Sequence, residues 1–201
     1  KKYGVKSAFK GYRGYPAQIC VSVQEELVHG IPGDRVIKEG EIVSLDAGVI
    51  YQGFYADAAV TVAVGELKPL TRRLLEVTRQ TLTKAIERAR AGGHLGDISA
   101  AIQDYAESQG FSVIREYTGH GIGRELHEEP QIPNFGVEGQ GPWLRPGMTL
   151  AIEPMLSAGD WRTRVLDNRW TVVTMDRSLT AHFEHTIAIG EHGAELLTAL
   201  I

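Results

Sequence analysis

The sequence is poor in cysteine, has no long apolar run and carries no strong excess of charge of either sign. Its single cysteine, Cys20, excludes an internal disulfide, which suits a reducing compartment. No apolar run approaches the ~18–20 residues of a membrane-spanning helix, and we expect neither a membrane span nor a signal peptide. A net charge of −4 gives no electrostatic reason to expect nucleic-acid specificity or binding to an anionic membrane.

What is present is an ordinary globular composition. Hydrophobic residues make up 43% of the 201 residues and charged residues 23%, which allows an ample core. No linker or low-complexity segment divides the chain. We therefore expect residues 1–201 to form a single domain.

A glycine-rich stretch carries two histidines seven positions apart, His120 and His127. Residues 117–130 read Tyr-Thr-Gly-His-Gly-Ile-Gly-Arg-Glu-Leu-His-Glu-Glu-Pro. We expect these glycines to give the backbone unusual conformations and to let a loop pass close to a ligand. The spacing fits neither a zinc finger nor the HExxH helix of a zinc protease. A histidine between two glycines, such as His120, is expected to point at a ligand.

Four acidic residues fall inside apolar segments whose composition predicts strands. These segments, each with its acid, are 41–50 with Asp46, 53–63 with Asp57, 148–156 with Glu153 and 181–189 with Glu184. The turn at 51–53 predicts a hairpin in which Asp46 and Asp57 are near neighbours. Two buried like charges repel, and burying either unpaired costs several kcal/mol. Solvated acids on a surface strand are the alternative, and the apolar run 42–50 argues against it.

The four carboxylates and His120 together predict a pair of divalent cations. Two such ions neutralise the four negative charges, and carboxylates can bridge ions about 3.5–4 Å apart. Mostly oxygen ligands with one imidazole suit Mn, Fe, Co or Zn. Two ions sharing a water supply a hydroxide near neutral pH, so hydrolysis of an amide or a phosphoester is the natural reaction. A further carboxylate or a histidine that is not a ligand would then move protons.

The remaining elements are expected to support this site. Residues 70–110 show helical periodicity and predict two helices, the first ended by Gly92-Gly93 and the second capped by Asp97. Residues 130–146 are expected to form a loop. Each half of the chain offers two acids on strands and a His-Gly pair, which indicates an internally duplicated core. Of the two histidines that flank Glu184, His182 is expected to be peripheral.

Six motifs, in this order and spacing, resemble the type I methionine aminopeptidases. They are Gly11-Tyr-Arg-Gly-Tyr-Pro16, Glu26-Leu-Val-His-Gly-Ile-Pro32, Leu45-Asp-Ala-Gly48 with Asp57, Gly119-His-Gly-Ile-Gly123 with His127-Glu-Glu-Pro130, Ile152-Glu-Pro-Met155 and Phe183-Glu-His-Thr186. The resemblance implies the α+β "pita-bread" (creatinase) fold: a curved antiparallel sheet backed by helices, with an internal pseudo-twofold repeat. It also implies a dinuclear metallo-exopeptidase that removes the N-terminal methionine with a hydroxide bridging two divalent metal ions (Co, Mn, Fe or Zn).

The resemblance further implies a role for each residue of the site. Asp46 would chelate one metal, Asp57 and Glu184 would bridge both, and His120 and Glu153 would complete the second. Glu153 would also accept a proton from the water. His127 would donate to the carbonyl oxygen and the tetrahedral intermediate, and His29 would contact the scissile amide or the leaving group. The methionine pocket would be formed by Tyr12, Tyr15, Cys20 and Trp170, with the less typical Phe9 and Leu126 at two further pocket positions.

The chain departs from the family pattern in two places. Ala58 stands where the family usually has threonine, which removes a hydrogen bond to a bridging ligand and is expected to lower metal affinity. The family also has a helix pair before the substrate loop, and this chain begins almost at that loop. A processed or truncated form, or one compensating by association, is therefore expected, with an exposed and sticky outer face on the N-terminal strands.

The expected partners are nascent polypeptides with an N-terminal methionine and a small second residue, in the cytoplasm, with a ribosome contact and no membrane. Two other interpretations remain open. Proline-specific peptidases (prolidase, aminopeptidase P) share the fold and the five ligands but usually add a large N-terminal domain. A catalytically inactive relative would serve as a binding module. Metal content separates the last from the enzymes, and Met-Ala against Xaa-Pro peptides separates the two enzymes.

Overall fold

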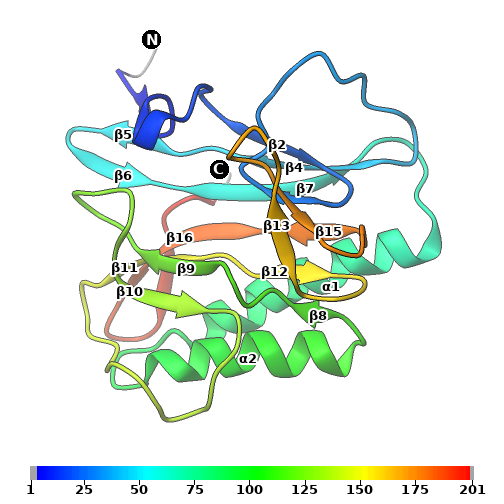
Figure 1. Cartoon of the computed structure of the whole chain (residues 1–201). Helices are drawn as coiled ribbons and strands as arrows, with labels where there is room; N and C mark the ends of the chain where they lie inside the picture. Colours follow the sequence, from blue (N-terminus) through cyan, green and yellow to red (C-terminus); the bar gives the residue numbers. More distant parts are fainter. Residues whose placement is uncertain (1–3, 200–201) are drawn as a thin grey trace.

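A computed structural model describes residues 4–199 and centres on one large antiparallel sheet (Figure 1). The strand order is β10-β9-β11-β16-β7-β4-β2, with β17 paired to β16. The bounds of these strands are β2 Cys20–Val23, β4 Ile42–Asp46, β7 Ala58–Ala63, β9 Thr118–Gly121, β10 Glu128–Pro133, β11 Thr149–Ile152, β16 Glu184–Ile189 and β17 Ala194–Leu196.

Three small sheets extend the large one at its strand ends. One joins β1 (Lys6–Ser7), β5 (Val49–Tyr51) and β6 (Phe54–Ala56). The second joins β15 (Thr180–His182), β12 (Met155–Ser157) and β8 (Ser112–Val113), and the third joins β13 (Thr163–Val165), β14 (Val172–Thr174) and β3 (Glu26–Val28). A short 3-10 helix spans Tyr12–Gly14. The predicted loop 130–146 is therefore wrong at its start, because β10 runs to Pro133 and pairs with β9.

The large sheet consists of two halves related by an approximate twofold axis between β7 and β16. Counted outward from the axis, β7, β4 and β2 follow one another on one side and β16, β11 and β9 on the other. The registers of the two halves match: Val43–Val62 corresponds to Leu150–Ile187, and Leu45–Val60 to Ile152–His185. One position further, Asp46–Ala59 corresponds to Glu153–Glu184. The expected internal duplication is confirmed at the level of the sheet.

Two helices cover the C-terminal half of the sheet. Helix α1 (Pro69–Arg88) contacts β11, β12, β15 and β16, and helix α2 (Leu95–Ser108) contacts β8 and β10 (Figure 1). Asp97 is the third residue of α2, not its cap, and its carboxylate accepts a hydrogen bond of 2.8 Å from the N–H of His94. The predicted second helix is confirmed, but it begins earlier than predicted.

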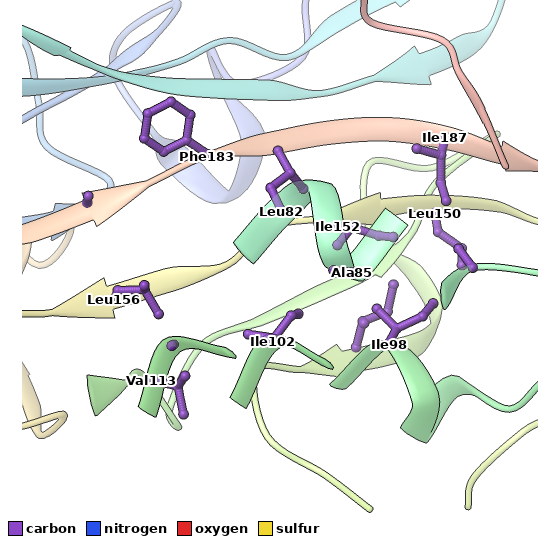
Figure 2. Close-up of a cluster of buried hydrophobic side chains, with 14 of the residues drawn as sticks. Leu82, Ala85, Ile98, Ile102, Val113, Leu150, Ile152, Leu156, Phe183 and Ile187 are labelled. Atoms are coloured by element: carbon purple, nitrogen blue, oxygen red, sulfur yellow. The ribbon is translucent and has the colours of Figure 1, made fainter. Parts of the chain in front are cut away.

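The main core lies between these helices and the C-terminal half (Figure 2). Leu82 and Ala85 of α1 and Ile98 and Ile102 of α2 point toward Leu150 and Ile152 of β11 and Ile187 of β16. Ile98, Ile152 and Ile187 are all fully buried. Burying such side chains contributes roughly 1.5–3 kcal/mol each, so this contact holds β11 and β16 in place.

The outer face of the N-terminal half is exposed, as expected. Leu45 and Val62 are 38% and 37% exposed, although their counterparts Ile152 and Ile187 are buried, and Val60 beside them is 42% exposed. A groove of about 750 Å³ continues this face between Val60, α1 and Leu196. Among residues 4–199, no helix combines the length and the apolar character needed to cross a bilayer.

Candidate metal centre and active site

Each of the four acids lies where a strand ends or is interrupted. Asp46 is the last residue of β4, and Asp57 separates β6 from β7. Glu153 follows β11 just before β12, and Glu184 is the first residue of β16, after the break from β15 at Phe183. The prediction of four continuous strands through these acids is therefore wrong. An interruption bends the strand and re-aims the side chain, so acids from both halves can converge.

Two threonine hydroxyls replace the ladder hydrogen bonds at these breaks. Thr186 Oγ1 accepts a hydrogen bond of 2.9 Å from the N–H of Asp57 and donates one of 2.8 Å to its carbonyl. Thr61 Oγ1 does the same for His182, at 2.9 Å and 2.8 Å. The two contacts are equivalent by the twofold axis, which also makes Asp57 and His182 counterparts. A buried backbone group without a hydrogen-bond partner destabilises the fold, and these hydroxyls provide the missing partners at the breaks.

The glycines around His120 allow close packing rather than unusual dihedral angles. His120 lies in strand β9, not in a loop, and Gly119, Gly121 and Gly123 do not have positive φ angles. A Cβ atom on Gly119 would lie 2.5 Å from the carbonyl oxygen of Ala151, and one on Gly121 would lie 2.3 Å from that of Glu129. These close approaches are to the neighbouring strands β11 and β10, and the predicted approach to a ligand stays a prediction.

Three of the five predicted ligands form a tight group. Asp57, His120 and Glu184 each place one ligand atom within 4.8 Å of the others, and all three are buried. His120 Nδ1 lies 2.8 Å from the carbonyl of Gly121, and because a carbonyl only accepts, Nδ1 carries the proton. The lone pair of Nε2 is thereby free for a cation. Glu153 Oε1 lies 3.6 Å from this Nε2.

The electrostatics of the chamber disfavour so many charged carboxylates. Burial, then the charge of Glu153, raises the pKa of Asp57 to about 7. Burial and the neighbouring acids also raise the pKa values of Asp46 and Glu184 well above the usual range. Asp46 Oδ1 and Glu184 Oε1 are buried, with no hydrogen-bond partner in the described part of the chain. These unpaired oxygens, with the free Nε2 of His120, fit a divalent cation.

The two auxiliary histidines line the same chamber, which has a volume of about 760 Å³. His127 Nδ1 lies 2.8 Å from the hydroxyl of Tyr12, and its ring centroid is 4.3 Å from that of His120. Burial and the neighbouring His120 lower the pKa of His127 to about 4, so it is neutral near pH 7. His29 has a left-handed backbone with φ 59° and packs edge-on to Tyr117. Such a conformation costs about 1–3 kcal/mol and clusters at functional sites.

The predicted side-chain pocket forms one apolar wall of the chamber. Phe9, Tyr15, Cys20 and Leu126 belong to one buried cluster, with Tyr12 and Trp170 packed against it. The rings of Tyr15 and Trp170 are 5.0 Å apart. Burial raises the pKa of the Cys20 thiol, which keeps it protonated and uncharged. All six pocket residues and all five predicted ligands line this chamber.

The expectation that His182 is peripheral is wrong. Its side chain is 2% exposed, and Nε2 lies 3.3 Å from Glu153 Oε2. Alternation along residues 181–189 does put His182 on the same face as Glu184, but nothing in the sequence shows that its side chain approaches Glu153. Arg13 also lines the chamber and was not predicted. Arg13 has a left-handed backbone with φ 48° inside the 3-10 helix Tyr12–Gly14, a conformation that the residue types around it do not predict.

The curved sheet with its buried acids and histidines is that of a pita-bread metallopeptidase. The family model of metallopeptidase family M24 matches residues 2–191. Methionine aminopeptidase 1 of Bacillus subtilis is 53% identical over 98% of this chain and 80% of its own length. The chain therefore belongs to family M24 and, within it, to the methionine aminopeptidases.

Solved structures of methionine aminopeptidases have the same fold as this chain. A crystal structure of methionine aminopeptidase from Thermotoga maritima has 59% identity and a TM-score of 0.96, covering 98% of this chain and 79% of that one. The enzyme from Rickettsia prowazekii has 43% identity and a TM-score of 0.97, with 98% and 80% covered. A prolidase from Pyrococcus horikoshii shares the fold, at 24% identity and a TM-score of 0.73, over 91% of this chain and 48% of that one.

Proposed function

We propose that the chain hydrolyses the first peptide bond of peptides and nascent proteins that begin with methionine, using two divalent metal ions. The observation that carries this proposal is the group of Asp57, His120 and Glu184, whose ligand atoms converge within 4.8 Å beside an apolar pocket. Asp46 and Glu153 lie in the same chamber and complete the set of five ligands. When bound, such a pair of ions lowers the pKa of a shared water and polarises the substrate carbonyl.

The residues around the metal centre would handle the protons. Glu153 would accept the proton of the attacking water. Its Oε1 lies 3.6 Å from His120 Nε2, beside the proposed ligands, and its Oε2 lies 3.3 Å from His182 Nε2. His127 would donate to the carbonyl oxygen as charge develops on it. If the phenol of Tyr12 donates to Nδ1, then Nε2 of this neutral histidine carries the proton needed. His29 would contact the scissile amide or the leaving group.

The apolar wall would select the first side chain. Tyr12, Tyr15, Cys20 and Trp170, with Phe9 and Leu126, would enclose the methionine thioether, for which an uncharged and polarisable surface is suitable. The substrate's α-amino group would bind beside the carboxylates, which limits cleavage to one residue at a time. We also take residues 1–201 as one catalytic domain, because a single sheet runs through both halves.

The finer assignments follow from the donor set and from the relatives. Oxygen ligands with one imidazole suit Co, Mn, Fe or Zn. The names of the relatives, methionine aminopeptidase, support substrates with an N-terminal methionine, and we propose nascent polypeptides with a small second residue. Excision of the N-terminal methionine would be a step of protein maturation, so we propose an enzyme of the cytoplasm that acts near the ribosome. The reduced, buried Cys20 is consistent with that compartment.

Peptide products test the proposal. The metal-loaded protein should release free methionine from Met-Ala-Ser and leave an Ala-Pro peptide intact. An N-acetylated Met-Ala-Ser serves as control and should not be cleaved, because its amino group is blocked. Cleavage of the Ala-Pro peptide would instead support a proline-specific peptidase, and release of methionine from the blocked peptide would contradict the exopeptidase assignment.

A further inference from the structure

His182 is a buried histidine to which the reaction as described assigns no task. It ends β15, its side chain is 2% exposed, and neither ring nitrogen has a hydrogen-bond partner within residues 4–199. A neutral imidazole has one donor and one acceptor, and a buried polar group without a partner costs about 1–3 kcal/mol. The acceptor closest to a hydrogen bond is Glu153 Oε2, 3.3 Å from Nε2.

We propose that His182 is a positioning residue for Glu153. Its Nε2–H donates to Glu153 Oε2 and holds the other oxygen, Oε1, toward His120. The present 3.3 Å is just beyond the usual N–H···O range of 2.7–3.2 Å, so a small rotation of either side chain completes the bond. This inference rests on the proposed function, because it assigns a cause to the orientation of the proposed proton acceptor.

The backbone of His182 is fixed on both sides, which makes it suited to orient another group. Thr61 of β7 binds its N–H and its carbonyl, at 2.9 Å and 2.8 Å. On the other side His182 is in register with Met155, two residues after Glu153. Its ring also borders a side cavity of about 190 Å³, together with His29, His127 and Glu153. The donor therefore belongs to a part of the sheet whose backbone is held on both sides, and it faces this side cavity.

The twofold axis shows why a donor is needed at this place. Asp57 and Asp46 of the N-terminal half correspond to His182 and Glu153 of the C-terminal half. The first pair is two acids, which suits two ligands for cations. The second pair is an acid beside an imidazole, which can hold one carboxylate oxygen by a hydrogen bond. Glu153 can then use its two oxygens differently, Oε1 toward the ligand group and Oε2 toward His182.

The consequence should fall on turnover and not on binding. Without the donor, the carboxylate of Glu153 can rotate, and its proton-accepting oxygen is no longer fixed. The apolar wall around Tyr15 and Cys20 belongs to a different cluster of side chains. We therefore expect kcat to fall about 10- to 100-fold, the usual effect of losing a partner behind a metal ligand, with KM within about twofold.

Three variants and one spectrum test this. H182F keeps the ring volume but removes the donor, so it should show the loss in kcat, whereas H182Q restores a donor and should recover kcat to within about threefold. The exposed His192 provides the matched control, and H192Q should behave as wild type. In the metal-free wild type, nitrogen-15 NMR of the neutral ring of His182 should show the Nε2–H tautomer.

Wild-type kcat in H182F, or equal losses in H182F and H182Q, would overturn the inference. So would the Nδ1–H tautomer, which decides alone if H182F does not fold. These outcomes differ from a failure of the proposed function, in which the metal-loaded wild type would itself release no methionine from Met-Ala-Ser.

Discussion

The two halves of the sheet share one backbone plan but use it differently. In both halves a strand is interrupted, and a threonine of the facing half, Thr186 or Thr61, binds the freed backbone groups. The residue whose backbone this threonine binds is Asp57 in the N-terminal half and His182 in the C-terminal half. The outer faces differ as well: Ile187 is buried under the helices, whereas its counterpart Val62 is 37% exposed.

This difference shows that the backbone determines where the residues of the site lie, whereas the side chain at each position determines its role. The twofold axis relates Asp46 to Glu153 and Asp57 to His182, and acids occupy three of these four positions. Glu184 adds a fourth acid, opposite Ala59. A metal centre built from residues of both halves depends on how the halves pack against each other. We therefore expect the half under the helices to contribute most of the stability, and the residues between the halves to carry out the reaction.

The largest effect is expected when Asp57, a proposed metal ligand between the two halves, loses its charge. Asp57→Asn keeps the shape of the side chain but weakens its binding to cations. Metal content should fall, and turnover with it by about a thousandfold or more, because several kcal/mol of transition-state stabilisation are lost. Metal analysis by mass spectrometry and peptide kinetics measure both, with the exposed Asp104→Asn as control. Unchanged metal content would remove Asp57 from the ligand set.

The next effect is expected at a residue that acts on substrate without binding metal. His127→Ala removes a donor to the developing oxyanion, which should cost about 10²–10³ in kcat. Metal content should remain as in the wild type, and the exposed His192→Ala serves as control. Turnover at the wild-type rate in His127→Ala would refute the assignment of this donor.

The contrast between the outer faces should appear in stability. Ile187→Ala opens a cavity in the helix-covered core and should cost about 2–5 kcal/mol of unfolding free energy. The equivalent change at the exposed position, Val62→Ala, should cost less than about 1 kcal/mol. Urea unfolding of the metal-free protein compares the two. Equal losses would mean that the outer face of the N-terminal half is packed as tightly as its counterpart.

The smallest effect is expected at Ala58, next to Asp57 in the chain. The N–H of Ala58 donates a hydrogen bond of 3.0 Å to Asp57 Oδ1, and a threonine hydroxyl there would add a second donor. Ala58→Thr should therefore raise metal affinity several-fold, at most about tenfold, with little change in turnover at saturating metal. Calorimetric titration of the metal-free protein is the measurement. An affinity equal to or below that of wild type would show that alanine costs nothing at this position.

Much of the site could be predicted from the sequence because its signals are local. Acids inside apolar segments are rare, so Asp46, Asp57, Glu153 and Glu184 stood out, and the chamber does bring them together. The apolar pattern likewise predicted the two helices, and the two acids and the His-Gly pair in each half predicted the duplication.

The rest depended on contacts between segments distant in sequence. The strand breaks are stabilised by hydroxyls more than 100 positions away, such as Thr186 for Asp57. No local pattern shows that Thr61 binds the backbone of His182 or that the ring of His182 approaches Glu153, so the position of this histidine was not predicted. The role of Gly121 depends on the nearby carbonyl of Glu129, which only the pairing of β9 and β10 reveals.

The most direct measurement is hydrolysis of Met-Ala-Ser by the metal-stripped protein, with Co, Mn, Fe or Zn added back. Metal-free protein should be inactive, and added metal should restore release of free methionine in proportion to the metal bound. Methionine release that continues without metal would contradict the account, and so would metal binding at Asp57, His120 and Glu184 without any cleavage.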